Sequence, residues 1–368
     1  MTTAVALGGR PATGAVPDLS RIHIVAPVPR QVWAEVVAAD PDAVVTQTPE
    51  WLDALCRSRG YRDASRLYEF PDGRRLVLPM AARVWAGARV TEESWPYGWS
   101  YGGALVAGGP FRSVDAAVVL ADLARRPVIR SAVVPMPLNS TVWQSAAPPT
   151  VHRVPYLTQI LDLEGGFGTV WSRRFRSEAR RHVRRAERMA LDVYQDHDRG
   201  AEAFAILHHE AVERWARQRG QPLWAARVLD RWRDDAGRIA AAVAAVGNSC
   251  SIWSAYRAGE PVAVCAVLHR GRHALGWLSA NRRAVAQETS ATYLLSSLAI
   301  EAACADGARY FNMGESDPGS GVERHKAQFG ATAVRYHALR LERLPLTEGE
   351  RVVRAAARRA SAFREGGA

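Results

Sequence analysis

The stretch Gly307–Leu341, GARYFNMGESDPGSGVERHKAQFGATAVRYHALRL, decides the fold that we expect for this chain of 368 residues. Residues 308–313 form a short aromatic-rich run after a helix-stopping glycine, which is typical of a buried strand. Glycine, serine, aspartate and proline dominate residues 314–321, as in a connecting loop. Residues 322–329 can form two helical turns that end at a glycine. Because residues 332–341 alternate as a strand does, the predicted order is strand, loop, short helix, strand.

The same stretch contains the only lysine of the chain, Lys326, among 48 lysine and arginine residues. Guanidinium is planar and stays protonated, so it does not replace lysine where a compact, mobile ammonium is needed. The alternative is a lysine that remains on a solvated face. The local pattern favours a functional role, and we predict that Lys326 lies in a cleft near Glu315 or Arg324.

The sequence G-V-E-R-H-K-A-Q-F-G-A after a G-E-S loop resembles the C-terminal signature of the Fem-like aminoacyl transferases and related tandem proteins of the GNAT acyltransferase superfamily. These families carry a lysine in a K-x-x-F-G-A context, here Lys326–Ala331. Relatives often have aspartate where Asn312 stands, so no acid role carries over to that position. Residues 161–186 resemble the same families, which have a strand and then a basic helix here. The resemblance covers residues 150–345 well and the first half only by layout.

The resemblance implies an α/β (α+β) fold of two tandem GNAT-like domains, each with a mixed, mostly antiparallel sheet flanked by helices. A proline-containing break at residues 146–149 marks the expected boundary between them. The expected parts are a flexible N-terminus at 1–20, an N-terminal GNAT-like domain at 21–148, a C-terminal GNAT-like domain at 149–345, and a C-terminal helix or tail at 346–368.

The composition predicts a folded, cytoplasmic protein that associates with polyanions. Hydrophobic residues make up 48% of the chain, and the formal net charge is +11. An excess of positive charge bears on the partners of the protein and not on its fold, and the candidates are nucleic acid, an acidic membrane surface and a phosphate-bearing cofactor. We expect no membrane span, because no apolar run approaches the required length. The four cysteines and ten histidines show no metal-ligand spacing, so no metal site is expected.

Eight arginines and only two glutamates lie between residues 173 and 188. Apolar residues recur among them at spacings of three and four, which predicts an amphipathic helix with one narrow apolar stripe. Uncompensated like charges at i, i+4 cost a few tenths of a kcal/mol each. This pattern favours phosphate binding over a merely solvated face. The predicted RNA-binding residues are Arg173, Arg174, Arg176, Arg180, Arg181, Arg184, Arg185 and Arg188.

The sequence of a second loop, residues 287–292, indicates which acyl donor the protein can bind. GNAT enzymes that use acyl-CoA hold its pyrophosphate on an R/Q-x-x-G-x-G/A loop, where glycines let backbone N–H groups reach the phosphates. Residues 287–292 here read Q-E-T-S-A-T, so serine and threonine replace both small positions. This departure puts CoA binding in doubt without excluding it.

The resemblance to Fem-like enzymes implies transfer of an aminoacyl group from aminoacyl-tRNA to an amine, with no cofactor and no covalent enzyme intermediate. The predicted catalytic residues are Lys326, facing the oxyanion or the phosphate of the terminal adenosine, and Glu315, accepting a proton. Glu288 is an alternative proton acceptor. The predicted substrate-binding residues are Trp277, Asn281, Glu288, Tyr293, Asn312 and Arg324. The aromatic, glycine-rich segment 95–103 is either one wall of an acceptor pocket or a packed loop.

Three functions remain open from the sequence: an aminoacyl-tRNA-dependent transferase, an acyl-CoA N-acyltransferase, and a non-catalytic RNA-binding module on a GNAT scaffold. Only the first uses both Lys326 and the arginine-rich segment, so we favour it. The amine acceptor is a soluble natural-product intermediate or a peptidoglycan precursor, with a slight preference for the soluble acceptor.

Overall fold

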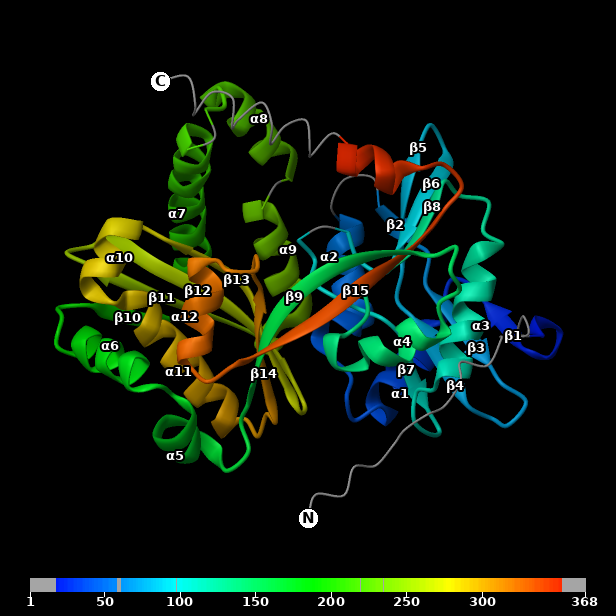
Figure 1. The fold of residues 1–368 in the computed structure, drawn as a ribbon, viewed down its shortest axis with the longest axis horizontal. Coiled ribbons are helices and arrows are strands. Elements are labelled where there is room, and N and C mark those ends of the chain that lie inside the picture. Colours follow the sequence, from blue (N-terminus) through cyan, green and yellow to red (C-terminus); the bar gives the residue numbers. More distant parts are fainter. Residues whose placement is uncertain (1–17, 58–60, 97, 219, 234, 353–368) are drawn as a thin grey trace, which may run out of the picture.

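The structure is a computed structural model that describes residues 18–57, 61–96, 98–218, 220–233 and 235–352. Two α/β halves lie side by side, with the N-terminal half on the right of Figure 1 and the C-terminal half on the left. Most of the N-terminus expected to be flexible lies outside the described residues, as does most of the predicted C-terminal tail. Residues 346–352 are helical.

A small antiparallel sheet of four strands, in the order β1-β3-β4-β7, belongs to the N-terminal half. Its strands are β1 (His23–Val25), β3 (Arg66–Glu69), β4 (Arg75–Leu78) and β7 (Leu105–Ala107). The helices of this half are α1 (Arg30–Ala39), α2 (Pro49–Arg57), α3 (Ser113–Ala124) and α4 (Ser140–Ala146). A turn with Gly73 at φ 81° connects β3 to β4, as the Asp-Gly pair predicts.

A second sheet of eleven strands runs through both halves, in the order β10-β11-β12-β13-β14-β9-β15-β8-β6-β5-β2. Its strands are β2 (Tyr61–Asp63), β5 (Ala81–Trp85), β6 (Ala88–Glu93), β8 (Arg130–Val133), β9 (His152–Asp162), β10 (Asp192–Gln195), β11 (Cys250–Arg257), β12 (Glu260–Arg270), β13 (His273–Asn281), β14 (Tyr310–Glu315) and β15 (Thr332–Glu342). Only the β13/β14 and β6/β8 neighbours are parallel. The predicted fold class of mixed, mostly antiparallel sheets flanked by helices is therefore confirmed.

Strand β15 connects the two halves. Residues 332–340 pair with β9 in the C-terminal half, and residues 339–342 pair with β8 in the N-terminal half. Figure 1 shows β15 and β9 crossing together from one half to the other. The two halves therefore share one continuous hydrogen-bonded sheet.

Eight α-helices and one π-helical turn of the described chain belong to the C-terminal half. They are α5 (Gly166–Thr169), the π-helical turn Val170–Arg174, α6 (Ser177–Glu187), α7 (His197–Gln218), α8 (Leu223–Arg233), α9 (Asp235–Val246), α10 (Arg283–Thr289), α11 (Ala291–Ala305) and α12 (Gly321–Gln328). The helical residues 346–352 follow β15 and lie against the N-terminal half. Among the described residues, none of the helices combines the length and apolar character needed to cross a bilayer.

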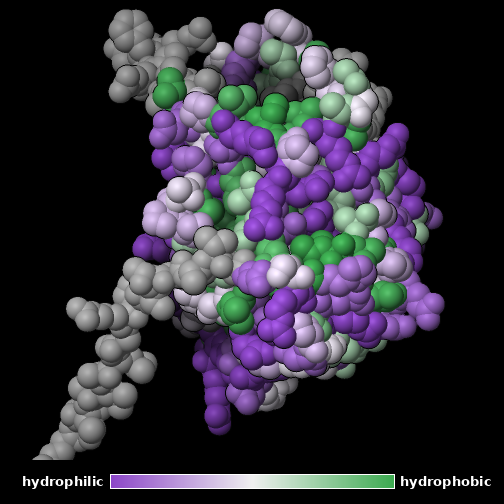
Figure 2. Space-filling view, turned by 90° about the vertical axis from the view of Figure 1, so that its right-hand side faces the viewer, coloured by the Kyte–Doolittle hydropathy of each residue, from purple (hydrophilic) through white to green (hydrophobic). Residues whose placement is uncertain are grey.

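A cluster of three tryptophans fills the contact between the halves. The ring of Trp51 on α2 lies edge-on to Trp99, at 5.3 Å, and to Trp277 on β13, at 5.0 Å between centroids. Trp51 and Trp99 are buried in one hydrophobic core that draws residues from both halves. The described residues of the aromatic segment 95–103 thus pack into the interface through Trp95, Trp99 and Tyr101. By contrast, Figure 2 shows the outer face of the N-terminal half as mostly hydrophilic, with separate hydrophobic areas.

Candidate functional site

The Lys326 ammonium lies at the end of β14, in the C-terminal half. Lys326 is only 8% exposed, and its Nζ donates hydrogen bonds of 2.7 Å to the carbonyl oxygens of Gly314 and Glu315. The pairing between β13 and β14 ends at Leu275 and Asn312, just before this point. Both strands continue beyond it without pairing to each other. Gly314 has φ 80°, and a Cβ there would lie 2.9 Å from the carbonyl oxygen of Gly276. Glycine is therefore required where β14 passes β13 beside the ammonium.

Burial changes the protonation of Lys326. It lowers the pKa of the ammonium from 10.5 to about 8, while the negative charge of Glu315 acts in the opposite direction. An ammonium has three N–H donors, and the two carbonyl groups use two of them. Near neutral pH the site thus holds a positive charge with one donor left for a ligand.

Glu315 is the last residue of β14, and its partly buried carboxylate accepts a hydrogen bond from the hydroxyl of Tyr336 on β15. Burial of the carboxyl group raises the pKa of Glu315, although the Tyr336 hydrogen bond and the charge of Lys326 both lower it. A carboxylate with a raised pKa suits a proton acceptor. Tyr336 was not predicted, because an alternating strand gives no signal for which of its residues faces a site.

Asn312 has a structural role at this site. It is 4% exposed, and its Oδ1 accepts hydrogen bonds from the Thr158 hydroxyl, at 2.6 Å, and from the Gly314 N–H, at 2.8 Å. Its Nδ2 donates to the hydroxyl of Tyr101, a buried residue of the N-terminal half, at 3.3 Å. Asn312 therefore fixes the backbone that carries the Lys326 acceptors, and it ties that backbone to the other half.

The remaining predicted substrate contacts on β13, Trp277 and Asn281, lie at different places along the strand. Trp277 is half-buried, and its Nε1 donates to the Gly98 carbonyl at 3.0 Å. Asn281 ends β13, opposite Ala263 of β12. Trp277 is thus already engaged by the N-terminal half, while Asn281 lies at the far end of the same strand.

Tyr293 belongs to an aromatic group at the start of α11. Its ring stacks on His182 of α6 at 4.3 Å and meets His325 of α12 at the same distance, and its hydroxyl donates to Gln328 at 2.6 Å. Ser290, at φ 60°, is buried directly before α11 and lies 2.9 Å from Nδ1 of His182. Burial lowers the pKa of His325 to about 4, so its ring is neutral at pH 7. These side chains occupy the helix start that binds phosphates in the acyl-CoA pattern.

Glu288 and Arg324 lie apart from these contacts. The exposed Glu288 forms a 2.8 Å ion pair with Arg257 at the end of β11. Arg324 is exposed on α12, two residues before the buried Lys326. The structure therefore brings together Lys326, Glu315 and Asn312 of the predicted set, and it adds Tyr336 and Tyr101.

The arginine-rich segment is not one helix, although the sequence predicts one. It divides at Phe175, whose extended backbone separates the π-helical turn from α6. Arg180 donates to the carbonyl oxygens of Trp171, at 3.1 Å, and Phe175, and Arg174 donates to that of Asp162. These two arginines are half-buried and stabilise the break. The other six are exposed: Arg173, Arg176, Arg181, Arg184, Arg185 and Arg188.

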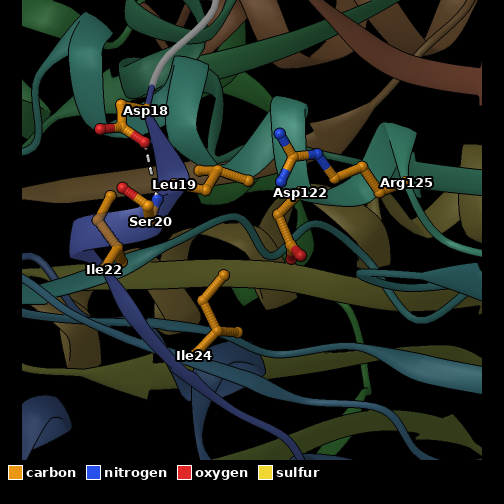
Figure 3. A pocket seen from close by; sticks show the side chains of 7 residues that line it. All are labelled: Asp18, Leu19, Ser20, Ile22, Ile24, Asp122 and Arg125. Atoms are coloured by element: carbon orange, nitrogen blue, oxygen red, sulfur yellow. Dashed lines mark hydrogen bonds between the residues drawn. The ribbon is translucent and has the colours of Figure 1, made fainter.

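Two surface pockets lie apart from Lys326. One, of about 410 Å³, is lined by Asp18, Leu19, Ser20, Ile22, Ile24, Asp122 and Arg125, and Figure 3 shows it between the N-terminal segment and α3. The other, of about 440 Å³, lies in the C-terminal half. Neither is lined by a predicted site residue. In the described part of the chain, no group of three or more His, Cys, Asp or Glu side chains is arranged to hold a metal ion.

Comparison with known proteins agrees with this architecture. Residues 173–327 match the sequence model of the Acetyltransferase (GNAT) domain. The solved structure of FemX is similar, with a TM-score of 0.61 and 10% identity over 87% of this chain and 97% of that chain. A tandem GNAT protein from the clavulanic acid biosynthesis pathway has a TM-score of 0.50 and 14% identity, over 88% and 99% of the two chains. No curated protein matches the sequence. The predicted resemblance to Fem-like and tandem GNAT-fold proteins is confirmed, as a likeness of fold.

Proposed function

We propose that this chain transfers an aminoacyl group from aminoacyl-tRNA to an amine acceptor, because residues 173–327 match the GNAT domain model and the fold is similar to that of FemX. The observation that carries the proposal is the buried Lys326 ammonium at the end of β14, with one donor left for a ligand. A positive charge in a water-poor site is worth most where negative charge develops in the transition state.

The residues around Lys326 supply each part of such a transfer. The acceptor nitrogen attacks the ester carbonyl, and the remaining N–H of Lys326 stabilises the oxyanion that forms. Glu315 takes the proton from the amine and returns it to the departing ribose oxygen, so one carboxylate serves both proton transfers. The Tyr336 hydrogen bond holds this carboxylate in place. The carbonyl then re-forms as an amide, and no bond to the enzyme is needed.

The six exposed arginines on and before α6 support tRNA as the donor. They lie in the same half as Lys326, on a helix that packs against α11 through Val183, Ala186 and Leu294. Their charges are compensated only weakly within the described residues, where the shortest ion pair of these six joins Arg181 to Glu178 at 4.0 Å. Phosphate contacts by exposed arginines position a nucleic acid without reading its sequence.

The start of α11 favours tRNA over acyl-CoA as the donor. In the acyl-CoA pattern, glycines leave the helix N-terminus open to pyrophosphate. Here the buried Ser290 hydroxyl contacts His182, and the rings of His182 and Tyr293 stack beside it. A CoA pyrophosphate would have to displace these contacts. The acceptor remains either a soluble amine or a peptidoglycan precursor.

A transfer assay with two labelled donors tests the proposal. The full chain is incubated with total tRNA charged with radiolabelled amino acids, or with labelled acetyl-CoA, together with a panel of soluble amines and a nucleotide-linked peptidoglycan precursor. Aminoacyl esters hydrolyse in mild alkali whereas amides survive, so alkali-stable label reports amide formation. We expect stable label from tRNA only. Label from acetyl-CoA, or none from either donor, would contradict the proposal.

A further inference from the structure

A second set of reactive side chains lines the pocket of about 440 Å³ in the C-terminal half. The lining residues are Gln195, Asp196, His197, Asn248, Cys250, Ser251, His269 and Asp306. Gln195, Cys250, Ser251 and His269 lie at the ends of β10, β11 and β12, and Asp306 follows α11, while the others lie at the start of α7 and in the turn before β11. The pocket shares no residue with the contacts of Lys326, and the proposed aminoacyl transfer uses none of its side chains.

Three of these residues, Asp306, His269 and Ser251, lie next to one another in that order. Oδ2 of Asp306 lies 3.7 Å from Nδ1 of His269, and Nε2 of the same ring lies 3.1 Å from the hydroxyl oxygen of Ser251. The carboxylate and the hydroxyl therefore face opposite nitrogens of one imidazole. This is the arrangement of a Ser-His-Asp triad, which is recognised by geometry and roles and not by sequence order.

The neighbouring amide determines the direction of the hydrogen bonds. Nε2 of Gln195 can only donate, and it lies 3.3 Å from the Ser251 oxygen. Ser251 therefore accepts from Gln195 and has its own proton available for Nε2 of His269. The remaining ring proton then lies on Nδ1, toward Asp306. Ser251 and His269 thus have the proton placement that a nucleophilic serine requires, while the Asp306 carboxylate, at 3.7 Å, is an ion-pair contact of the ring and not a hydrogen bond.

We propose that Ser251, His269 and Asp306 form a second catalytic site, which hydrolyses small acyl esters. Ser251 and His269 are half-buried and line the pocket, so a ligand in the pocket can reach the Ser251 hydroxyl. Asn248 is exposed at the pocket, where its amide can donate to an oxyanion. Asp306 is a positioning residue, because it acts on the ester only through the ring of His269.

The reaction balances with water as the only co-reactant. The Ser251 oxygen attacks the ester carbonyl carbon while Nε2 of His269 takes the hydroxyl proton. The C–O bond to the alcohol breaks, and the alcohol leaves with that proton. Water then attacks the acyl-serine, again giving its proton to His269, and the carboxylic acid leaves as Ser251 recovers its proton.

Labelling with a fluorophosphonate probe tests the assignment on the full chain. An activated serine displaces fluoride from the probe and forms a stable bond to phosphorus, and peptide mapping then locates the labelled residue. We expect one label per chain, on Ser251, and no label in Ser251→Ala. His269→Gln should slow labelling by about 10²–10⁴-fold, the usual contribution of a positioned base. Equal labelling of the wild type and Ser251→Ala would overturn the proposal.

Matched variants separate this site from the rest of the molecule. Ser145→Ala changes an exposed serine of α4 whose hydroxyl donates to the Val142 carbonyl, and Lys326→Arg changes the proposed transferase site. Both should label at the wild-type rate and hydrolyse p-nitrophenyl acetate normally. Asp306→Asn should lower kcat for this ester and leave KM unchanged, with a smaller effect than His269→Gln. Loss of hydrolysis in Lys326→Arg with full activity in Ser251→Ala would place the esterase activity at Lys326 instead.

Discussion

The hydroxyl of Tyr101 and the side-chain amide of Asn312, 211 positions apart in the sequence, meet at 3.3 Å in the buried contact between the two halves. Through its other atom, Oδ1, Asn312 accepts from the Gly314 N–H and so fixes the turn whose carbonyl groups hold Lys326. The N-terminal half thus contributes to the geometry of a site whose charged residues all lie in the C-terminal half.

Removing the Tyr101 hydroxyl should weaken both the fold and the proposed transfer. Tyr101→Phe leaves the buried Nδ2 of Asn312 without this acceptor, which costs about 1–3 kcal/mol of unfolding free energy. Urea unfolding measures this decrease, and the transfer assay measures the effect on turnover. Tyr194→Phe on β10, which keeps its ring contact with Tyr256, is the matched control and should leave both unchanged. A Tyr101→Phe protein with wild-type stability would show that this hydrogen bond contributes nothing.

The salt dependence of tRNA binding should separate the exposed arginines from the anchored ones. Replacing Arg181, Arg184 and Arg185 with glutamine removes three exposed charges. The log–log slope of affinity against salt should then flatten by about 0.7–0.9 for each phosphate that the protein no longer neutralises. Filter binding at several salt concentrations gives the slope. An unchanged slope would mean that these three arginines face solvent and do not contact phosphate groups of the tRNA.

Arg180→Gln is the matched control for that experiment. Arg180 donates to the Trp171 and Phe175 carbonyl groups at the break before α6, so its removal leaves half-buried acceptors without a partner. We therefore expect a lower melting temperature with a nearly unchanged salt slope. The reverse result would show that Arg180 binds phosphate.

The sequence predicts the individual strands and the functional lysine better than it predicts which strands pair and which side chains contact one another. Period-two alternation identifies β15, but it does not show that this strand leaves β9 to pair with β8. The K-x-x-F-G-A context indicates a functional Lys326. By contrast, nothing in the sequence distinguishes Arg180 from Arg181, because their roles depend on the backbone break at Phe175. The roles of Tyr336 and Tyr101 are not predicted for the same reason. Only tertiary packing brings Tyr336 to Glu315 and Tyr101 to Asn312.

The Tyr336 hydroxyl should control the acid side of the pH–rate profile. Its hydrogen bond lowers the pKa of Glu315, so Tyr336→Phe should raise that pKa further. Because the proposed proton acceptor must be ionised, the acid limb of kcat/KM should move to higher pH in this variant. Transfer rates measured over a pH series test the shift. A profile that does not move would remove Glu315 from the role of proton acceptor.

The single lysine allows its own titration to be measured directly. Reductive methylation with ¹³C-formaldehyde labels only Lys326 and the terminal amine, and the signal missing from methylated Lys326→Arg identifies the lysine. Burial lowers the Lys326 pKa from 10.5 to about 8, so its resonance should titrate near pH 8, and turnover should fall as the pH rises through that value. The unfolded chain holds this proton up to about pH 10.5. Relative to Lys326→Met, the wild type should therefore gain stability between pH 8 and 10.5, by about 3 kcal/mol at most. A resonance that titrates near 10.5 would contradict both the buried position and the proposed role.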